Sequence, residues 1–204
     1  MEITLDKIGK RFSNKEWIFK DLSQHFKPGD RIAITGSNGS GKSTLLKIIG
    51  GMALPTTGEI QYHDGDTLMD ADQLINHVSF ASPYLELIEE FSLSEMLQFH
   101  FQFKKIRGSL SLNELIDKMY FTGHEHKLIK NFSSGMKQRL KLGLCFFTHS
   151  SLVLLDEPSS NLDQVGTDWY QEQIHNLPPE VIVFVASNLA SEYQFCNQII
   201  NMTQ

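Results

Sequence analysis

A glycine-rich stretch at residues 36–43 reads GSNGSGKS and combines the residue types that bind phosphate groups. The β-branched apolar run 31–35 precedes it, and residues 44–49 have the apolar pattern of one helix face. This order of strand, glycine-rich loop and helix is the context that such a loop requires. Its glycines let successive backbone N–H groups face one anion, and the helix N-terminus contributes the positive end of its dipole. The stretch therefore predicts a site for a chain of phosphates.

Two side chains at the end of this stretch suit the terminal phosphates and a metal ion. Lys42 is placed to reach the β- and γ-phosphates of a nucleotide, and the hydroxyl of Ser43 is placed to hold Mg²⁺. A glycine-rich turn that only joins a strand to a helix is the competing interpretation, and a second motif later in the chain argues against it. The other predicted binding residues of the loop are Gly36, Ser37, Asn38, Gly39, Ser40, Gly41 and Thr44.

Asp156 and Glu157 form an acidic pair that begins 114 residues after Lys42. The continuous apolar run 152–155 precedes the pair, as expected of a strand that is buried on both faces and carries acids at its carboxyl end. Asp156 would accept a hydrogen bond from Mg²⁺-bound water, and Glu157 would polarise the attacking water. Two acids that merely end a surface strand are the alternative. The position after the glycine-rich loop, with helices between, favours the catalytic interpretation.

Strand-like segments lie toward both ends of the chain, and they must position these motifs. Each is short, rich in β-branched or aromatic residues and bounded by turn-forming residues. These segments are 3–8, 17–22, 30–35, 59–62, 78–81, 181–186 and 198–202.

The middle of the chain has a different pattern, in which Leu, Met and Phe recur at helical spacing with breaks at glycines. This predicts an inserted helical subdomain at about 84–149, between core segments at about 1–83 and 150–204 of a single domain. The aromatic residues of the first helical run, expected as helix core or as a face that meets a partner, are Phe99, Phe101 and Phe103.

The composition limits the classes of function. A chain of 204 residues suits one large domain. Its net charge of −6 gives no electrostatic reason to expect non-specific nucleic-acid binding, which depends on Lys and Arg neutralising phosphates. Cys145 and Cys196 lack metal-site spacing and are expected to be buried free thiols in a reducing cytosol. No signal-peptide pattern and no apolar run near the ~20 residues that cross a bilayer is found, so a membrane role is expected to need a partner.

An aromatic ring near the N-terminus could stack on adenine, because the flat face of a ring suits any base. Phe12, in the polar loop 10–14, is one candidate, and Trp17 is the other. A ring that simply caps the edge of a small sheet is an equally good interpretation of Phe12. The sequence leaves these alternatives open.

A third motif connects these sites to a known family. Residues 132–139 read FSSGMKQR and resemble the signature motif of ABC transporter ATPases, which is usually LSGGQ followed by a basic helix. The segment 159–163, SSNLD, resembles the D-loop that follows the acidic strand in this family. With the Walker A loop at 36–43 and the Walker B acids, these motifs match the family in order and spacing over essentially the whole chain.

The resemblance implies an α/β fold with a P-loop NTPase core of mainly parallel sheet, a small N-terminal antiparallel β subdomain and an inserted helical subdomain. It also implies ATP and Mg²⁺ as cofactors and a head-to-tail pair, either a homodimer or a pair with another ATPase subunit. ATP bound by one Walker A loop would be closed over by Ser133, Ser134 and Gly135 of the other protomer, where a helix N-terminus offers N–H groups to an anion. The D-loop position adds Asp163 to the nucleotide site.

The resemblance implies a membrane partner as well. In this family the helical subdomain docks on an integral membrane permease. The chain is therefore expected to be cytoplasmic and peripheral, held at the inner face of the cell membrane through the permease. No nucleic acid is expected as a partner.

Two switch positions depart from the family pattern. The family has a glutamine after the strand that corresponds to 78–81, whereas this chain continues Ser-Pro-Tyr. The family has a histidine after the last core strand, whereas this chain has Ser187-Asn188-Leu189. Ser187 or Asn188 can donate a hydrogen bond to phosphate, but neither can carry positive charge. Ser187 is the predicted binding residue, and turnover is expected to be slower than in typical members.

Two functions from different classes follow. The first is the ATP-hydrolysing subunit of an ABC transporter, which the retained Glu157 favours. The second is an ATP-sensing interaction module that hydrolyses little, which the altered switch positions motivate. An ABC protein of DNA repair or translation ranks last, because such proteins need a long coiled-coil insertion or a second cassette.

Overall fold

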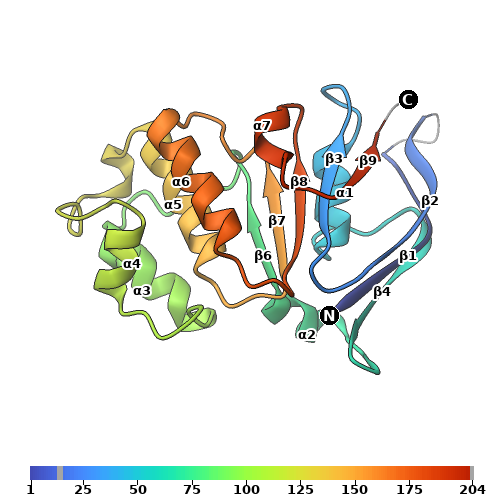
Figure 1. The fold of residues 1–204 in the computed structure, drawn as a ribbon, viewed down its shortest axis with the longest axis horizontal. Coiled ribbons are helices and arrows are strands. Elements are labelled where there is room, and N and C mark those ends of the chain that lie inside the picture. The colour runs from blue at the N-terminus through green and yellow to red at the C-terminus, as the bar shows by residue number, and fades with distance from the viewer. Residues whose placement is uncertain (13–15, 203–204) are drawn as a thin grey trace. The chain divides into compact units, whose positions relative to one another are not determined.

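The computed structural model describes residues 1–12 and 16–202 (Figure 1). Internal contacts divide the chain into two compact units. The first, here called the sheet unit, comprises Met1–Phe80, Ser151–Glu157 and Pro178–Gln204, and the second, the helical unit, comprises Ala81–Ser150 and Pro158–Leu177. The sequence assigned 158–177 to the core, whereas in the structure these residues group with the helices.

The sheet unit contains two sheets, and every strand except the two-residue strand Thr67–Leu68 overlaps a strand segment predicted from the sequence. The strands are β1 (Glu2–Arg11), β2 (Trp17–Phe26), β3 (Arg31–Thr35), β4 (Thr57–Asp64), β5 (Thr67–Leu68), β6 (Val78–Ala81), β7 (Leu152–Asp156), β8 (Ile182–Ala186) and β9 (Gln198–Asn201). A four-stranded antiparallel sheet has the order β2-β1-β4-β5, and a five-stranded sheet has the order β6-β7-β8-β3-β9. In the larger sheet β3 is parallel to β8 and β9, and β7 is parallel to β8.

The central strands are held by an apolar core. Every residue of β7 and of β8 is buried, as in parallel strands that are covered on both faces. Helix α1 (Lys42–Ile49) contributes four apolar side chains to the same core cluster as β1, β3 and β8. Phe26 and Phe184 meet edge to face with 4.8 Å between ring centroids, which joins the end of β2 to β8. The core therefore fixes the strand ends from which the site loops leave.

The carboxyl ends of three neighbouring strands lie level with one another. Asp156 of β7 is the register partner of Ala186 in β8, and Ala186 is the register partner of Ile34 in β3. Because these strands are parallel, the segments that follow them leave the sheet at the same edge (Figure 1). The glycine-rich loop, the acidic pair and the residues after β8 therefore emerge side by side.

The helical unit contains α3 (Leu93–Phe103), α4 (Leu112–Lys118), the 3₁₀ helix η1 (Ile129–Asn131), α5 (Ser134–Phe146) and α6 (Gln164–His175). Helices α3 and α4 both begin with a capping box. The Ser92 hydroxyl accepts a hydrogen bond from the backbone N–H of Glu95, and the Glu95 carboxylate accepts one from the backbone N–H of Ser92. Ser111 and Glu114 repeat the arrangement. These pairs are Ser-x-x-Glu patterns, so the sequence itself marks where the two helices start.

Three helices were not predicted from the sequence. They are α2 (Ala71–His77) and α7 (Ala190–Tyr193) of the sheet unit, and α6 of the helical unit. Helix α6 buries Trp169 and Tyr170, and the indole N–H of Trp169 donates to the carbonyl of Lys118 at 2.8 Å. The segments predicted from the sequence after residue 151 were strands, and α6 was missed although its buried residues, Gly166, Trp169, Tyr170 and Ile174, have the spacing of one helix face.

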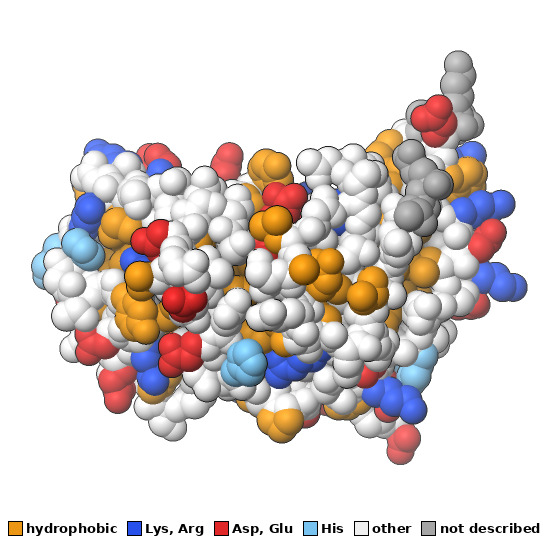
Figure 2. Space-filling view, turned by 45° about the horizontal axis from the view of Figure 1, so that its top comes forward, with side chains coloured by type: hydrophobic (Ala, Val, Ile, Leu, Met, Phe, Trp, Pro, Cys, Tyr) orange, Lys and Arg blue, Asp and Glu red, His pale blue; other side chains and the backbone are white. Residues whose placement is uncertain are grey.

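The surface of α3 carries aromatic side chains that the sequence left undecided. Phe99 and Phe103 are 39% and 70% exposed, and Phe91, Phe99 and Phe103 stack edge to face in series. Helix core is therefore the wrong interpretation of Phe99 and Phe103, and a face that meets a partner stays a prediction. On the face drawn in Figure 2, hydrophobic side chains reach the surface in small groups between charged and polar ones.

Two further expectations concern cysteines and membranes. Both cysteines are free; Cys145 is buried and Cys196 is partly exposed. Burial raises the pKa of the Cys196 thiol to about 12, although Arg31 acts in the opposite direction. Within 1–12 and 16–202, the structure contains no helix with the length and apolar character needed to span a bilayer.

Candidate nucleotide site

The glycine-rich loop joins the end of β3 to the start of α1, and its conformation depends on its glycines. Gly36, Gly39 and Gly41 have φ angles of 146°, 84° and 99°, in the region that favours glycine. A Cβ at Gly36 would lie 2.7 Å from the hydroxyl of Ser40, and one at Gly41 would overlap the side chain of Ile18. The tight turn therefore excludes other residues at Gly36 and Gly41, whereas the space beside Gly39 is open.

Lys42 and Ser40 fit a loop that binds an anion. The Lys42 ammonium is buried and donates to the carbonyls of Gly36 and Ser37 at 2.8 and 3.1 Å. The Ser40 hydroxyl is buried and makes no hydrogen bond within the described part of the chain. A bound phosphate would stabilise this arrangement, because it would pair with the buried ammonium and accept a hydrogen bond from the Ser40 hydroxyl.

Ser43 and Asp156 meet although they lie 113 residues apart in the sequence. The Ser43 hydroxyl donates to a carboxylate oxygen of Asp156 at 2.9 Å, and Asp156 is 2% exposed. These oxygens are the hard donors that Mg²⁺ prefers, and Mg²⁺ is usually held by one or two carboxylates together with substrate phosphates. The described residues contain no cluster of three or more His, Cys, Asp or Glu that could hold a metal ion. The donor set therefore fits Mg²⁺ bound with a nucleotide.

Glu157 has an unusual backbone conformation beside this pair. Its φ is 43°, a left-handed value that costs a residue other than glycine about 1 kcal/mol or more. Its backbone N–H donates to the carbonyl of Ala186 at 2.9 Å, so β8 holds the turn in place. Backbone strain of this kind is common at active sites, where it fixes the direction of a side chain. The strain at Glu157 therefore fits its predicted catalytic role.

The segment after β8 brings Asn188 to the phosphate loop. The Asn188 carboxamide is exposed and donates to the side-chain oxygen of Asn38 at 3.0 Å. Ser187 is 1% exposed, and its hydroxyl accepts from the backbone N–H of Leu189 at 2.9 Å. Of the two donors that the sequence offered here, the structure therefore brings Asn188 to the loop and keeps the predicted Ser187 in the protein interior.

The two adenine-stacking candidates differ in how accessible their rings are. Arg11 and Lys20 lie over the Trp17 ring, at 5.0 and 5.7 Å from its centroid. Phe12 is 76% exposed, and Lys10 lies 5.3 Å from its centroid. Phe12 therefore offers the freer ring for a base.

The strand that carries Trp17 also reaches the loop. Ile18 of β2 packs against Gly41, so the antiparallel sheet contacts the glycine-rich loop directly. Gly41 is the N-cap of α1, so the start of β2, with the Trp17 ring, lies beside the end of the loop at which α1 begins.

The signature residues lie in the helical unit, at the start of α5. Ser133 caps the helix, and its hydroxyl accepts from the N–H of Met136 at 3.2 Å. Gly135 lies so close to the carbonyl of Asn161 that a Cβ would be 2.9 Å from it. A pocket of about 370 Å³ opens here, lined by Ser133, Ser134, Gly135, Met136, Arg139, Asn161, Leu162 and Asp163. The signature and the D-loop thus share one polar pocket with a helix N-terminus in it.

Arg139 is a member of this pocket that the sequence analysis did not single out. Its guanidinium lies 5.1 Å from the ring centroid of Phe121, and its Nε is buried without a hydrogen bond to any described residue. Burial lowers the pKa of Arg139, and the nearby carboxylate of Asp163 raises it. Asp163 also caps α6 by accepting from Gly166 at 2.8 Å. The basic character of the signature helix was the available signal, but it did not indicate which basic residue faces the pocket.

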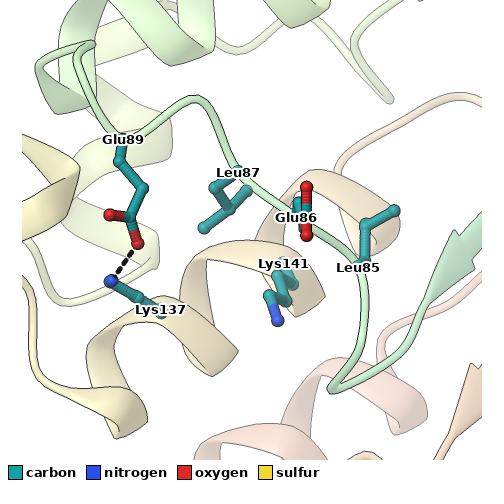
Figure 3. Close-up of a pocket in the computed structure, with 6 residues that line it drawn as sticks. All are labelled: Leu85, Glu86, Leu87, Glu89, Lys137 and Lys141. Atoms are coloured by element: carbon teal, nitrogen blue, oxygen red, sulfur yellow. Dashed lines mark hydrogen bonds and ion pairs between the residues drawn. The ribbon is translucent and has the colours of Figure 1, made fainter.

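A second pocket, of about 380 Å³, lies between the segment after β6 and helix α5 (Figure 3). Lys137 pairs with Glu89 at 2.5 Å, and Lys141 donates to the carbonyl of Pro83 at 2.5 Å. Lys141 is 8% exposed, and burial together with Lys137 lowers its pKa. Where the family has its glutamine, this chain therefore has a segment held by two lysines on one face of α5.

The comparison with protein families decides the relationship. A family model described as ABC transporter matches residues 19–160. The chain belongs to the ABC transporter family. The resemblance that rested on the motifs is thereby confirmed.

Curated relatives in the ABC transporter family cover most of this chain. It is 27% identical to an uncharacterized ABC transporter ATP-binding protein, YcbN, of Bacillus subtilis, over 92% of the chain. It is 29% identical to the sulfate/thiosulfate import ATP-binding protein CysA 1 of Agrobacterium fabrum, over 100% of the chain. In both comparisons the match spans 61% of the relative, so the chain corresponds to about three fifths of their length.

Solved structures show the same fold. A putative ABC transporter ATP-binding protein from Pyrococcus furiosus has a TM-score of 0.80 at 19% identity, covering 99% of this chain and 98% of that one. A dimeric ATP-binding cassette, MJ0796, bound to ADP and phosphate in a post-hydrolysis state, has a TM-score of 0.78 at 23% identity, covering 98% and 93%. The predicted fold class is confirmed.

Proposed function

We propose that the chain is the ATP-binding and ATP-hydrolysing subunit of an ABC transporter, which drives transport through separate membrane permease subunits. The contact between Ser43 and Asp156 carries this proposal, because it joins the phosphate loop to the acidic pair in one site. Family membership and relatives such as the sulfate/thiosulfate import ATP-binding protein of Agrobacterium fabrum support the transport role.

Each residue of the site has a role in hydrolysis. The loop N–H groups and the Lys42 ammonium bind the phosphates, with the lysine donors moving from loop carbonyls to phosphate oxygens. Ser43 and Asp156 would hold Mg²⁺, which would neutralise negative charge on the phosphates. Glu157 polarises the attacking water. Phe12 supplies a ring for the adenine.

A second protomer would complete the site. The signature pocket offers the N-terminus of α5 to an anion, as does the phosphate loop, and no described residue of this chain fills it. The nucleotide held by one protomer would be enclosed by Ser133, Ser134, Gly135 and Asp163 of the other. The dimeric cassette MJ0796, a structural neighbour, supports this arrangement. The partner ATPase is a second copy or a related subunit, and the permease holds the pair at the inner face of the membrane.

The test is steady-state phosphate release from Mg²⁺-ATP by the purified chain, run at several protein concentrations beside Lys42→Ala. We expect release that rises more steeply than linearly with concentration, because two protomers form each site, and that falls to the buffer background in Lys42→Ala. An unchanged rate in Lys42→Ala would contradict the proposed site. ATP binding with no release would favour the sensing module, for which Asn188 at the switch position is the motivating observation.

A further inference from the structure

The hydrogen bond between Asn38 and Asn188 connects two segments that lie 150 residues apart in the sequence. Asn38 lies at the tip of the phosphate loop, and Asn188 lies just beyond the end of β8. Both side chains are exposed, so packing does not force them together. Burial of apolar surface therefore does not account for this contact between two exposed carboxamides beside the phosphate loop.

Asn188 stands on a rigid support. The N–H of Ser187 donates to the carbonyl of Ile34 at 3.1 Å, and the Ser187 hydroxyl accepts from Leu189 at 2.9 Å. The preceding residue, Ala186, is fully buried and accepts the backbone N–H of Glu157. The residue before Asn188 is therefore bound to β3 and the residue after it is bound to Ser187, so the side chain of Asn188 starts from a defined point.

Asn38, in contrast, belongs to the least supported part of the loop. Ser37, Asn38 and Gly39 are exposed, and nothing lies within 4 Å of the place where a Gly39 side chain would begin. The Ser37 carbonyl accepts from the Ser40 N–H at 3.1 Å and from the Lys42 ammonium at 3.1 Å, and neither bond ties the tip to the sheet. Glycines on either side of the tip add backbone freedom that binding must remove.

We propose that the Asn38–Asn188 pair is a brace that holds the tip of the phosphate loop in its binding conformation before a nucleotide arrives. Asn188 is then a positioning residue, which acts through Asn38 by reducing the ordering cost of binding. Because the restraint acts on the loop, it strengthens the binding of nucleoside diphosphates and triphosphates equally. The proposal rests on the proposed nucleotide site.

The brace is tested by measuring the affinity of the purified chain for Mg²⁺-ADP and Mg²⁺-ATP in Asn188→Ala, Asn38→Ala and the double variant. One exposed hydrogen bond corresponds to about a three- to ten-fold change in affinity. We expect each single variant to weaken both nucleotides by the same factor in this range, and the double variant to be no weaker than either single. Asn76→Ala, which removes an exposed asparagine from α2 of the same unit, is the matched control and should change neither affinity.

A second readout needs no nucleotide. Amide hydrogen exchange at Gly39, Ser40 and Gly41 should be faster in both single variants than in the unmodified chain and in Asn76→Ala. Loss of ATP affinity with ADP affinity intact would overturn the brace and assign Asn188 to the third phosphate. Additive losses, or unchanged exchange, would also overturn it. Failure of the unmodified chain to bind either nucleotide would instead reject the proposed function, and the exchange data would still decide the brace.

Discussion

At the scale of single residues, the site is defined by contacts between segments that are distant in the sequence. The hydroxyl of Ser43 contacts Asp156, the backbone of Glu157 is bound to Ala186, and Asn188 contacts Asn38. The last two contacts join the ends of neighbouring parallel strands, and the first joins α1, which follows β3, to the end of β7, with β8 between these two strands. Small changes to the polar side chains here should alter metal use and hydrolysis without altering the fold, because only Ala186, which contributes its carbonyl, belongs to the apolar core.

Ser43→Ala should separate metal binding from nucleotide binding. The variant loses the hydroxyl that donates to Asp156, so the gain in ATP affinity produced by Mg²⁺ should fall about ten-fold or more. Titration of fluorescent ATP with and without Mg²⁺ measures this gain. Ser43→Thr keeps the hydroxyl and should retain most of it. An equal gain in Ser43→Ala and the unmodified chain would remove Ser43 from the metal site.

At the scale of elements, polar contacts join the helices of the helical unit to the segments packed beside them. Lys141 on α5 holds Pro83, Trp169 on α6 holds the end of α4, and His100 on α3 contacts Thr148 just beyond α5. The Thr148 hydroxyl donates to the carbonyl of Leu144 at 2.7 Å, so it must accept from the ring N–H of His100. The Nε2 nitrogen of His100 therefore carries a proton, which is so in the neutral Nε2–H tautomer and in the charged ring alike.

The pH dependence of stability should report this histidine. Burial, with help from Lys104, lowers the pKa of His100 from 6.5 to about 4. Below pH 6.5 the unfolded chain therefore binds more protons at this residue than the folded chain does. The contribution of His100 to the free energy of unfolding is fully present above pH 6.5 and is lost as the pH falls toward 4. Between pH 8 and pH 5 this residue should account for about 2 kcal/mol of the loss in unfolding free energy.

Urea unfolding at pH 8 and pH 5 measures this contribution. His100→Gln keeps a donor for Thr148 and should lose about 2 kcal/mol less than the unmodified chain between these values. His175→Gln, on the exposed side of α6, should behave as the unmodified chain does. Identical pH dependence in all three proteins would show that His100 titrates normally.

At the scale of the whole molecule, the chain separates the two halves of its proposed chemistry. The sheet unit carries the phosphate loop and the acidic pair, and the helical unit carries the signature pocket. The signature pocket contains a helix N-terminus, and no described residue of the same chain fills it. In a site composed of two protomers, this pocket would receive the nucleotide that the partner holds. The proposed dimer assigns a role to both sets of motifs.

Ser134→Glu should prevent ATP-dependent dimerisation without unfolding α5. A carboxylate in the first turn favours the helix through its dipole, but it would repel the phosphates held by the partner. In a Glu157→Gln background, where slow hydrolysis preserves bound ATP, light scattering should detect a dimer with Mg²⁺-ATP. The dimer should persist in Ser134→Gln and disappear in Ser134→Glu, while ATP binding by the monomer remains. A dimer that survives Ser134→Glu would place the interface elsewhere.

The sequence determined the family, the strands and the phosphate loop, because these depend on local signals. Glycines at positions with left-handed φ, continuous apolar runs before polar residues and Ser-x-x-Glu helix starts are visible in any short window. Helix α6 was missed although its buried residues recur at helical spacing, because only three of them are large and polar residues occupy most of the other positions.

Only the tertiary structure decided which residues meet. The meeting of Ser43 with Asp156, the choice of Asn188 over Ser187 at the loop and the presence of Arg139 in the signature pocket all depend on strand register and helix rotation. A shift of one residue in register turns a strand side chain to the other face of its sheet, and a rotation of about 100° moves a helix side chain away from the face it would otherwise occupy. That orientation is set by how the apolar core packs, which no short stretch of sequence contains.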